Sequence, residues 1–139
     1  MSREGSATTV VIQTETDIVL VRQATREAAL AAGFSLVQQT KLVTAASELA
    51  RNALVYGGGG KAEIEVEETA QTGTVWLTFI DSGPGIPDIE RALTDGYTTG
   101  SGLGLGLGGA RRLADRFHIE SAPGQGTVIK LAISTRRKT

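Results

Sequence analysis

The segments KAEIEVEE at residues 61–68 and TVWLTFID at residues 74–81 alternate polar and apolar side chains. A period of two is typical of strands that bury one face. The short connection Ala70-Gln71-Thr72-Gly73 between them predicts an antiparallel hairpin. We expect the aromatic side chains of Trp76 and Phe79 in the core.

Two helical patterns precede this hairpin. Residues 17–32 have apolar side chains at helical spacing, and Gly33 is a typical stop signal. This first stripe consists of Ile18, Val21, Ala24, Ala28 and Ala31. Ser35 and Gln38 have the spacing of a capping box, which predicts a second helix running to about Tyr56. Its stripe consists of Leu42, Ala46, Leu49 and Ala53.

The remaining patterns complete one domain, residues 1–139, with a core at about residues 8–133. We expect strands at residues 8–14, near residues 118–121 and at residues 126–134, and helices at residues 87–93 and 106–117. Helices and hairpin strands in this order predict an α+β fold. We expect a two-layer α/β sandwich, with an antiparallel or mixed sheet and helices on one face.

Composition excludes several classes of protein. The 139 residues carry a net charge of −1, so no positive excess is available for a nucleic-acid backbone. The chain has no cysteine and a single histidine, His118, which argues against a zinc or disulfide site. No apolar run approaches the length of a membrane span, and no signal-peptide pattern opens the chain. We expect a cytoplasmic protein that binds neither nucleic acid nor membrane.

Glycine is the unusual component, with 18 residues that are concentrated in a few segments. In GSGLGLGLG, residues 100–108, leucines alternate with glycines directly before a predicted helix. Backbone N–H groups freed by glycine at a helix N-terminus suit an anion such as a triphosphate. No parallel βαβ unit surrounds this segment, so a dinucleotide fold is not expected. GGGGK at residues 57–61 fails the P-loop pattern, because Val55 and Ala62 replace its required residues.

Two further motifs have side chains suited to nucleotide chemistry. Glu48 and Asn52 are four residues apart and therefore share one helix face, where they could position Mg²⁺ and polarise a hydroxyl. The alternative is a solvated helix edge. Asp81-Ser82-Gly83-Pro84-Gly85 follows an apolar strand, so Asp81 could accept a hydrogen bond from a ligand amine beside a flat ring. The alternative is an ordinary turn.

The three motifs, in this order and followed by Gly126-Thr127, resemble the GHKL nucleotide-binding superfamily of gyrase, Hsp90, histidine kinases and anti-sigma kinases. The resemblance covers about residues 8–133 and implies the Bergerat type of sandwich. Within the superfamily the chain is most similar to the serine/threonine kinases that act as switches in bacterial stress signalling. The narrower resemblance depends on LARN at residues 49–52, DGYTTG at residues 95–100 and GARRLAD at residues 109–115.

The resemblance implies a role for each matching residue. Glu48 would be the catalytic base, and Asn52 would bind Mg²⁺ together with ATP. Asp81 would bind the adenine amine, with Thr127 supporting that contact and Gly85 giving room for the ring. Gly83 would also belong to the cofactor-binding residues. Gly102, Gly104 and Gly106 would wrap the phosphates as a short lid, and the neighbouring Gly100, Ser101, Leu103 and Leu105 would belong to the same cofactor-binding segment.

The resemblance also implies partners. We expect phosphorylation of a STAS-domain antagonist on Ser or Thr, and activation of a PP2C-type phosphatase by the released kinase. Two alternatives stay open: an anti-sigma factor kinase that sequesters a sigma subunit, and a non-catalytic binding module whose shape depends on nucleotide. From the length of 139 residues we expect neither the dimerisation helices of a histidine kinase nor the transducer domain of gyrase and Hsp90.

Overall fold

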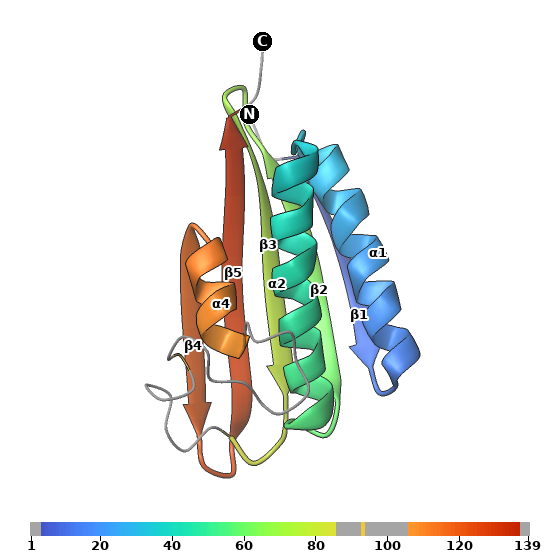
Figure 1. The fold of residues 1–139 in the computed structure, drawn as a ribbon, viewed down its shortest axis with the longest axis vertical. Coiled ribbons are helices and arrows are strands. Elements are labelled where there is room, and N and C mark those ends of the chain that lie inside the picture. Colours follow the sequence, from blue (N-terminus) through green and yellow to red (C-terminus); the bar gives the residue numbers. More distant parts are fainter. Residues whose placement is uncertain (1–3, 86–92, 94–105, 137–139) are drawn as a thin grey trace.

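The computed structural model describes residues 4–85, 93 and 106–136. The elements in chain order are β1 (Glu4–Ile12), α1 (Glu15–Ala31), α2 (Leu36–Val55), β2 (Gly60–Glu68), β3 (Thr72–Asp81), α4 (Gly106–Leu113), β4 (Arg116–Ala122) and β5 (Gly126–Arg136). The strands form one sheet in the order β1-β2-β3-β5-β4, and all four neighbouring pairs are antiparallel. The three helices of the described part of the chain lie over one face of this sheet, which confirms the predicted two-layer α+β sandwich (Figure 1).

The core lies between the sheet and the helices and is built from rows of cross-strand neighbours. Each row combines residues paired in register on adjacent strands. One row consists of Ile64, Leu77, Leu131 and Phe117, and the next row of Ala62, Phe79, Ile129 and Ile119. Leu42, Ala46 and Leu49 of α2 are fully buried in the same cluster, as the helical stripe predicted. Burial of a large apolar side chain contributes about 1.5–3 kcal/mol.

Helix α2 begins and ends where the sequence indicates, whereas α1 begins at Glu15, two residues before its predicted start. The Ser35 hydroxyl accepts a hydrogen bond from the Gln38 backbone N–H (3.2 Å), and Gln38 Oε1 accepts one from the Ser35 N–H (3.0 Å), which confirms the capping box. Helix α2 ends at Val55, and Tyr56 caps it. At the end of α1, Gly33 adopts a φ of 86°, a left-handed conformation that favours glycine.

Three predictions about local structure were wrong. Helix α4 ends at Leu113, because Phe117 pairs with Leu131 in the sheet; Arg116 therefore lies on β4 and not on the helix with Arg111 and Arg112. Trp76 lies on the face opposite Val75 and Leu77, where its Nε1 donates to Glu67 Oε1 (2.9 Å) and Lys130 Nζ lies 5.0 Å from its ring centroid. In α1, Ala31 is exposed, whereas Thr25 and Ala29 are fully buried.

Smaller differences concern element bounds. Strand β1 spans Glu4–Ile12, and β3 already begins at Thr72, so the connection in the central hairpin is shorter than predicted. The helix expected at residues 87–93 lies outside the described residues except for Leu93, which is buried. Among the described helices, none is both long and apolar enough to span a membrane.

Candidate functional site

A polar row ends the buried face of the sheet. Asp81 at the end of β3 pairs with Thr127 on β5, and Thr127 pairs in turn with Ser121 on β4. The preceding row on the same face is apolar, with Phe79, Ile129 and Ile119. Figure 1 shows that this end of the sheet and the C-terminal end of α2 lie at the same, lower end of the molecule. The fold therefore gathers polar groups from three strands beside a helix end.

The Asp81 carboxylate is held by glycine backbone. Its Oδ1 accepts a hydrogen bond from the Gly83 N–H (3.0 Å). A Cβ atom on Gly57 would lie 2.4 Å from Asp81 Cγ, and one on Gly83 would lie 2.6 Å from Gly57 Cα. Only glycine permits such approaches. The two sequence motifs at residues 57–60 and 81–85 therefore meet in the folded chain.

The loop after β3 is also joined to the β4–β5 turn. The Gly124 N–H donates to the Pro84 carbonyl (2.8 Å). Gly85 adopts a φ of 83°, and a Cβ atom there would lie 2.2 Å from the Ala122 carbonyl oxygen. Residues 82–85 thus form a bent loop after β3, and this loop is packed on both sides against other segments of the site.

Thr127 is 6% exposed, and its hydroxyl has a partner that sequence reasoning missed. Ser121 Oγ lies 2.8 Å from Thr127 Oγ1 and also donates to the Gly126 carbonyl (3.1 Å). The available signal was the alternation Phe117, Ile119, Ser121, which places a polar side chain last on the buried face of β4. Ser121 therefore belongs to the same polar row as Asp81.

Glu48 and Asn52 lie on α2. Glu48 is 8% exposed, and within the described ranges it has no ion pair. The Asn52 carbonyl accepts hydrogen bonds from the Tyr56 and Gly57 N–H groups (2.9 and 3.2 Å), which ties this helix end to the glycine that contacts Asp81. The burial of Glu48 argues against a simple solvated helix edge.

The Asn52 side chain has an unsatisfied polar atom. Its Nδ2 is buried and has no hydrogen-bond partner among the described residues. Rotating the amide exchanges its nitrogen and oxygen positions, so the same position could present an oxygen ligand. A buried unpaired amide costs stability unless a ligand satisfies it. This residue therefore fits a role in holding Mg²⁺, whose preferred ligands are oxygens.

Gly100, Ser101, Gly102, Leu103, Gly104 and Leu105 lie outside the described residues. Gly106 begins α4, and the following Leu107 and Ala110 are buried in the core cluster shared with α2. In the part of the chain that is described, no group of three or more His, Asp or Glu side chains could hold a metal.

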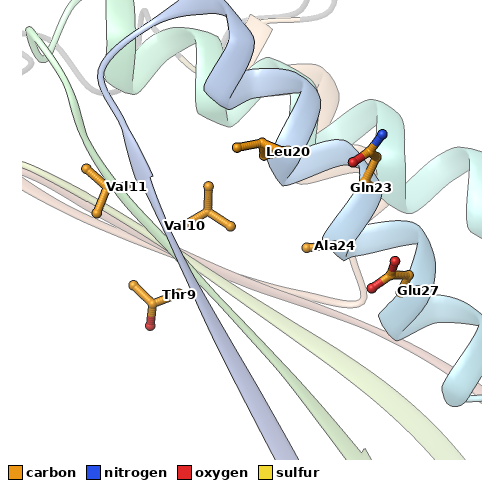
Figure 2. Close-up of a pocket in the computed structure, with 7 residues that line it drawn as sticks. All are labelled: Thr9, Val10, Val11, Leu20, Gln23, Ala24 and Glu27. Atoms are coloured by element: carbon orange, nitrogen blue, oxygen red, sulfur yellow. The ribbon is translucent and has the colours of Figure 1, made fainter.

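A separate groove of about 390 Å³ lies between β1 and α1. Figure 2 shows Val10 pointing toward α1, whereas Thr9 points to the opposite side of the strand. The lining residues are Thr9, Val10, Val11, Leu20, Gln23, Ala24 and Glu27. None of them belongs to the sequence motifs. The residues that the sequence predicts for nucleotide binding at Asp81 and Thr127 lie elsewhere, at the end of the sheet that carries Asp81.

Comparison of the sequence with known proteins identifies the family of this chain. The profile of the family described as histidine kinase-, DNA gyrase B- and HSP90-like ATPase matches residues 37–137. The chain is 47% identical over 123 residues to the serine/threonine-protein kinase RsbT of Bacillus subtilis (strain 168), covering 87% of this chain and 91% of the relative. It is 34% identical over 97 residues to an anti-sigma F factor of Bacillus licheniformis, covering 66% of each.

Solved structures agree on the fold. The RsbU and RsbW domains of Rv1364c from Mycobacterium tuberculosis match with a TM-score of 0.66 at 20% identity, over 98% of this chain and 34% of that chain. The mycobacterial sensor histidine kinase MprB matches with a TM-score of 0.53 at 16% identity, over 99% of this chain and 100% of that chain.

The chain therefore belongs to the family of histidine kinase-, DNA gyrase B- and HSP90-like ATPases. Its fold is the α+β sandwich expected from the GHKL resemblance. Within this family it is a homologue of the serine/threonine-protein kinase RsbT, and it is a protein kinase that uses ATP.

Proposed function

We propose that the chain transfers the γ-phosphate of Mg-ATP to a serine or threonine of a STAS-domain antagonist, and that the released kinase binds and activates a PP2C-type phosphatase. The observation that carries this proposal is the polar row of Asp81 and Thr127 beside the helix of Glu48 and Asn52, in a chain 47% identical to RsbT. These four side chains supply acceptors for an amine, an oxygen ligand for a cation and a base.

The base of ATP would bind at the polar row. The Gly83 N–H already donates a hydrogen bond to Asp81 Oδ1. The second carboxylate oxygen of Asp81 is therefore the acceptor for the C6 amine of adenine. The Thr127 hydroxyl supports this contact from the neighbouring strand. Gly83 and Gly85 keep the adjoining backbone free of side chains, which leaves room for the flat ring.

The triphosphate would extend from the base toward α2 and the glycine-rich segment. Asn52 would hold Mg²⁺ through its amide oxygen, and residues Gly100, Ser101, Gly102, Leu103, Gly104, Leu105 and Gly106 would wrap the phosphates with backbone N–H groups. Magnesium supplies charge neutralisation on the phosphate oxygens when it is bound. The protein's main task is then to align the acceptor hydroxyl.

Glu48 would act as the base. Its carboxylate accepts the proton of the attacking serine or threonine hydroxyl while the new oxygen–phosphorus bond forms and the bond to ADP breaks. Burial at 8% exposure keeps this carboxylate largely out of bulk water. An acceptor hydroxyl that replaces water at this position turns ATP hydrolysis into transfer to protein.

One observation favours a second candidate function. The 34% identity to an anti-sigma F factor extends over 97 residues, so an anti-sigma factor kinase that binds a sigma subunit is the alternative. Binding of purified sigma subunits from the same organism would distinguish it from the partner switch.

The proposal is tested by transfer of label from [γ-³²P]ATP to purified STAS-domain proteins of the source organism, with and without Mg²⁺. We expect Mg²⁺-dependent labelling of a serine or threonine, reduced about 100-fold or more by Glu48→Gln with ATP binding retained. The matched control is Glu63→Gln, on β2 outside the site. ATP binding without labelling of any STAS-domain protein would contradict the proposed substrate, and full transfer by Glu48→Gln would contradict the proposed base.

A further inference from the structure

We propose that Ser121 is a positioning residue that fixes the Thr127 hydroxyl as a hydrogen-bond acceptor, and thereby makes the base site selective for purines with an amino group at C6. This inference rests on the proposed function, because it assumes that the base binds at Asp81. It concerns a residue that has no role in the sequence motifs. Its basis is the direction of two hydrogen bonds.

The first step is a count of protons. A serine hydroxyl has one proton to donate. Ser121 Oγ lies 3.1 Å from the Gly126 carbonyl oxygen and 2.8 Å from Thr127 Oγ1. A carbonyl can only accept, so both contacts are hydrogen bonds if Ser121 donates to Gly126 and Thr127 donates to Ser121. We assign the protons in this way, and the assignment leaves only lone pairs of Thr127 Oγ1 for a ligand.

The second step is that the carbonyl accepting this proton cannot turn away. Gly126 has a φ of 79°, and a Cβ atom there would lie 2.2 Å from the Asp81 carbonyl oxygen. It is also the residue that pairs with Ala122 at the end of the β4–β5 ladder. Its carbonyl is therefore held by the sheet, and the chain of hydrogen bonds from Thr127 through Ser121 to Gly126 has one direction.

The third step concerns Asp81. Thr127 pairs with this residue across β3 and β5, and the Asp81 carboxylate is also an acceptor. The row thus presents acceptors from two neighbouring strands and no hydroxyl donor from Thr127. An amino group at C6 donates to such a row. A carbonyl at C6 would place an acceptor against acceptors, which leaves buried polar groups unpaired.

The fourth step is the consequence of removing Ser121 Oγ. In Ser121→Ala the Thr127 hydroxyl loses the partner for its proton and is free to rotate. It can then donate to a carbonyl oxygen at C6. The penalty for a 6-oxo purine should fall, while the amine contact of Asp81 with ATP remains. The expected signature is a change in the ratio of two affinities and not a uniform loss of binding.

The test compares calorimetric titrations of Mg-ATP and Mg-ITP, since inosine carries an oxo group where adenosine carries the C6 amine. We expect wild type to prefer ATP by about 100-fold or more. Ser121→Ala should reduce this preference about tenfold and change the ATP affinity only a few-fold. Ser121→Thr, which keeps the hydroxyl, should restore the preference.

The matched control is Ser134→Ala. Ser134 Oγ also lies 2.8 Å from a cross-strand threonine hydroxyl, that of Thr74, but this pair is exposed and lies outside the polar row. The control should leave the preference unchanged. In a Thr127→Val background, adding Ser121→Ala should have no further effect on the ratio, which keeps the test valid if the single variant is less stable.

An unchanged ATP-to-ITP ratio in folded Ser121→Ala, with ATP still bound by wild type, would overturn this inference and leave the proposed function intact. Equal losses for both nucleotides would also overturn it, since they indicate a purely structural role. Failure of wild type to bind ATP would overturn the proposed function and this inference with it.

Discussion

Asp81 and Thr127 pair across β3 and β5 at the end of an otherwise apolar buried face. The pair places a carboxylate and a hydroxyl from strands far apart in sequence next to each other. Asp81 lies two residues after the buried Phe79 in β3, and Thr127 lies two residues before the buried Ile129 in β5. Because the two strands are antiparallel, their register alone places Asp81 and Thr127 side by side. The same strands that build the core therefore also position the proposed base site.

Asn52 gives a prediction in which stability and function separate. Asn52→Leu removes a buried amide nitrogen that has no partner among the described residues, so the free energy of unfolding without ligand should stay equal or rise. The variant should lose Mg²⁺-dependent ATP affinity by about tenfold or more. Urea unfolding and titration of ATP with and without Mg²⁺ measure the two effects.

A second buried amide on the same helix is the control for Asn52. Gln39 is 8% exposed, and its Nε2 donates to the Phe34 carbonyl (3.1 Å). Gln39→Leu should lower the free energy of unfolding by about 1–3 kcal/mol, because the carbonyl loses its donor. If Asn52→Leu were as destabilising as Gln39→Leu, Asn52 would have a structural role and not the proposed one.

Gly85 gives a prediction about backbone packing. Gly85→Ala should lower the free energy of unfolding by about 3 kcal/mol or more, because strain at positive φ adds to a contact of 2.2 Å with the Ala122 carbonyl. Gly58→Ala, at a φ of 71° with no atom within 4 Å, should cost only about 1–2 kcal/mol. Equal losses in urea unfolding would contradict the close packing of residues 81–85 against the β4–β5 turn.

Thr25 gives a prediction about the core. Its hydroxyl is buried and has no partner in the described part of the chain, although the residue lies on the face of α1 that packs on the sheet. Thr25→Val replaces this hydroxyl by a methyl group of similar size, so the free energy of unfolding should rise by about 1 kcal/mol. Thr40→Val is the control, since the exposed Thr40 hydroxyl donates to the Leu36 carbonyl (2.9 Å) and should give no such gain. A loss of stability in Thr25→Val would contradict the conclusion that the buried Thr25 hydroxyl is unpaired and destabilising.

Asp17 gives a prediction about pH. Its carboxylate accepts a hydrogen bond from the Gln13 N–H (2.8 Å), which is the main cause that lowers the pKa of Asp17 below its ordinary value of 3.8; the Thr14 N–H contributes less. A depressed folded pKa stabilises the protein above the unfolded pKa, and this stability is lost as pH falls through the folded pKa. Asp17→Asn should therefore be less stable than wild type at pH 7, and this difference in stability should vanish below the folded pKa of Asp17. An equal difference in unfolding free energy at pH 7 and pH 2 would contradict it.

Local patterns predicted much of the fold because they have direct physical causes. The alternation in residues 61–68 and 74–81 and the capping box at Ser35 correctly predicted the central hairpin and α2. The helix expected at residues 106–117 was predicted too long, because helix-forming residues precede Phe117. Phe117 lies in a strand because it pairs with Leu131 in the sheet, a contact that the local sequence does not show. Trp76 was misplaced because aromatic character outweighed its position in the alternation.

The candidate site could be predicted only in part. Asp81 and Thr127 belong to motifs, and the structure places them side by side. Ser121 belongs to no motif, and its contact with Thr127 follows from a register that two separate strands set together. Burial of Glu48 likewise depends on how α2 packs against its neighbours. The roles of Glu48 and Asn52 remain predictions that the experiments above test, and the role of the glycine-rich segment remains a prediction.

The most direct test of the central claim is calorimetric titration of Mg-ATP into wild type and Asp81→Asn. The variant keeps an oxygen for the Gly83 N–H but presents an amide donor where the base amine needs an acceptor. We predict saturable binding to wild type and at least about tenfold weaker binding to the variant, with similar unfolding temperatures. Equal affinities, or no binding to wild type, would contradict the assignment of this polar row as the nucleotide-binding site.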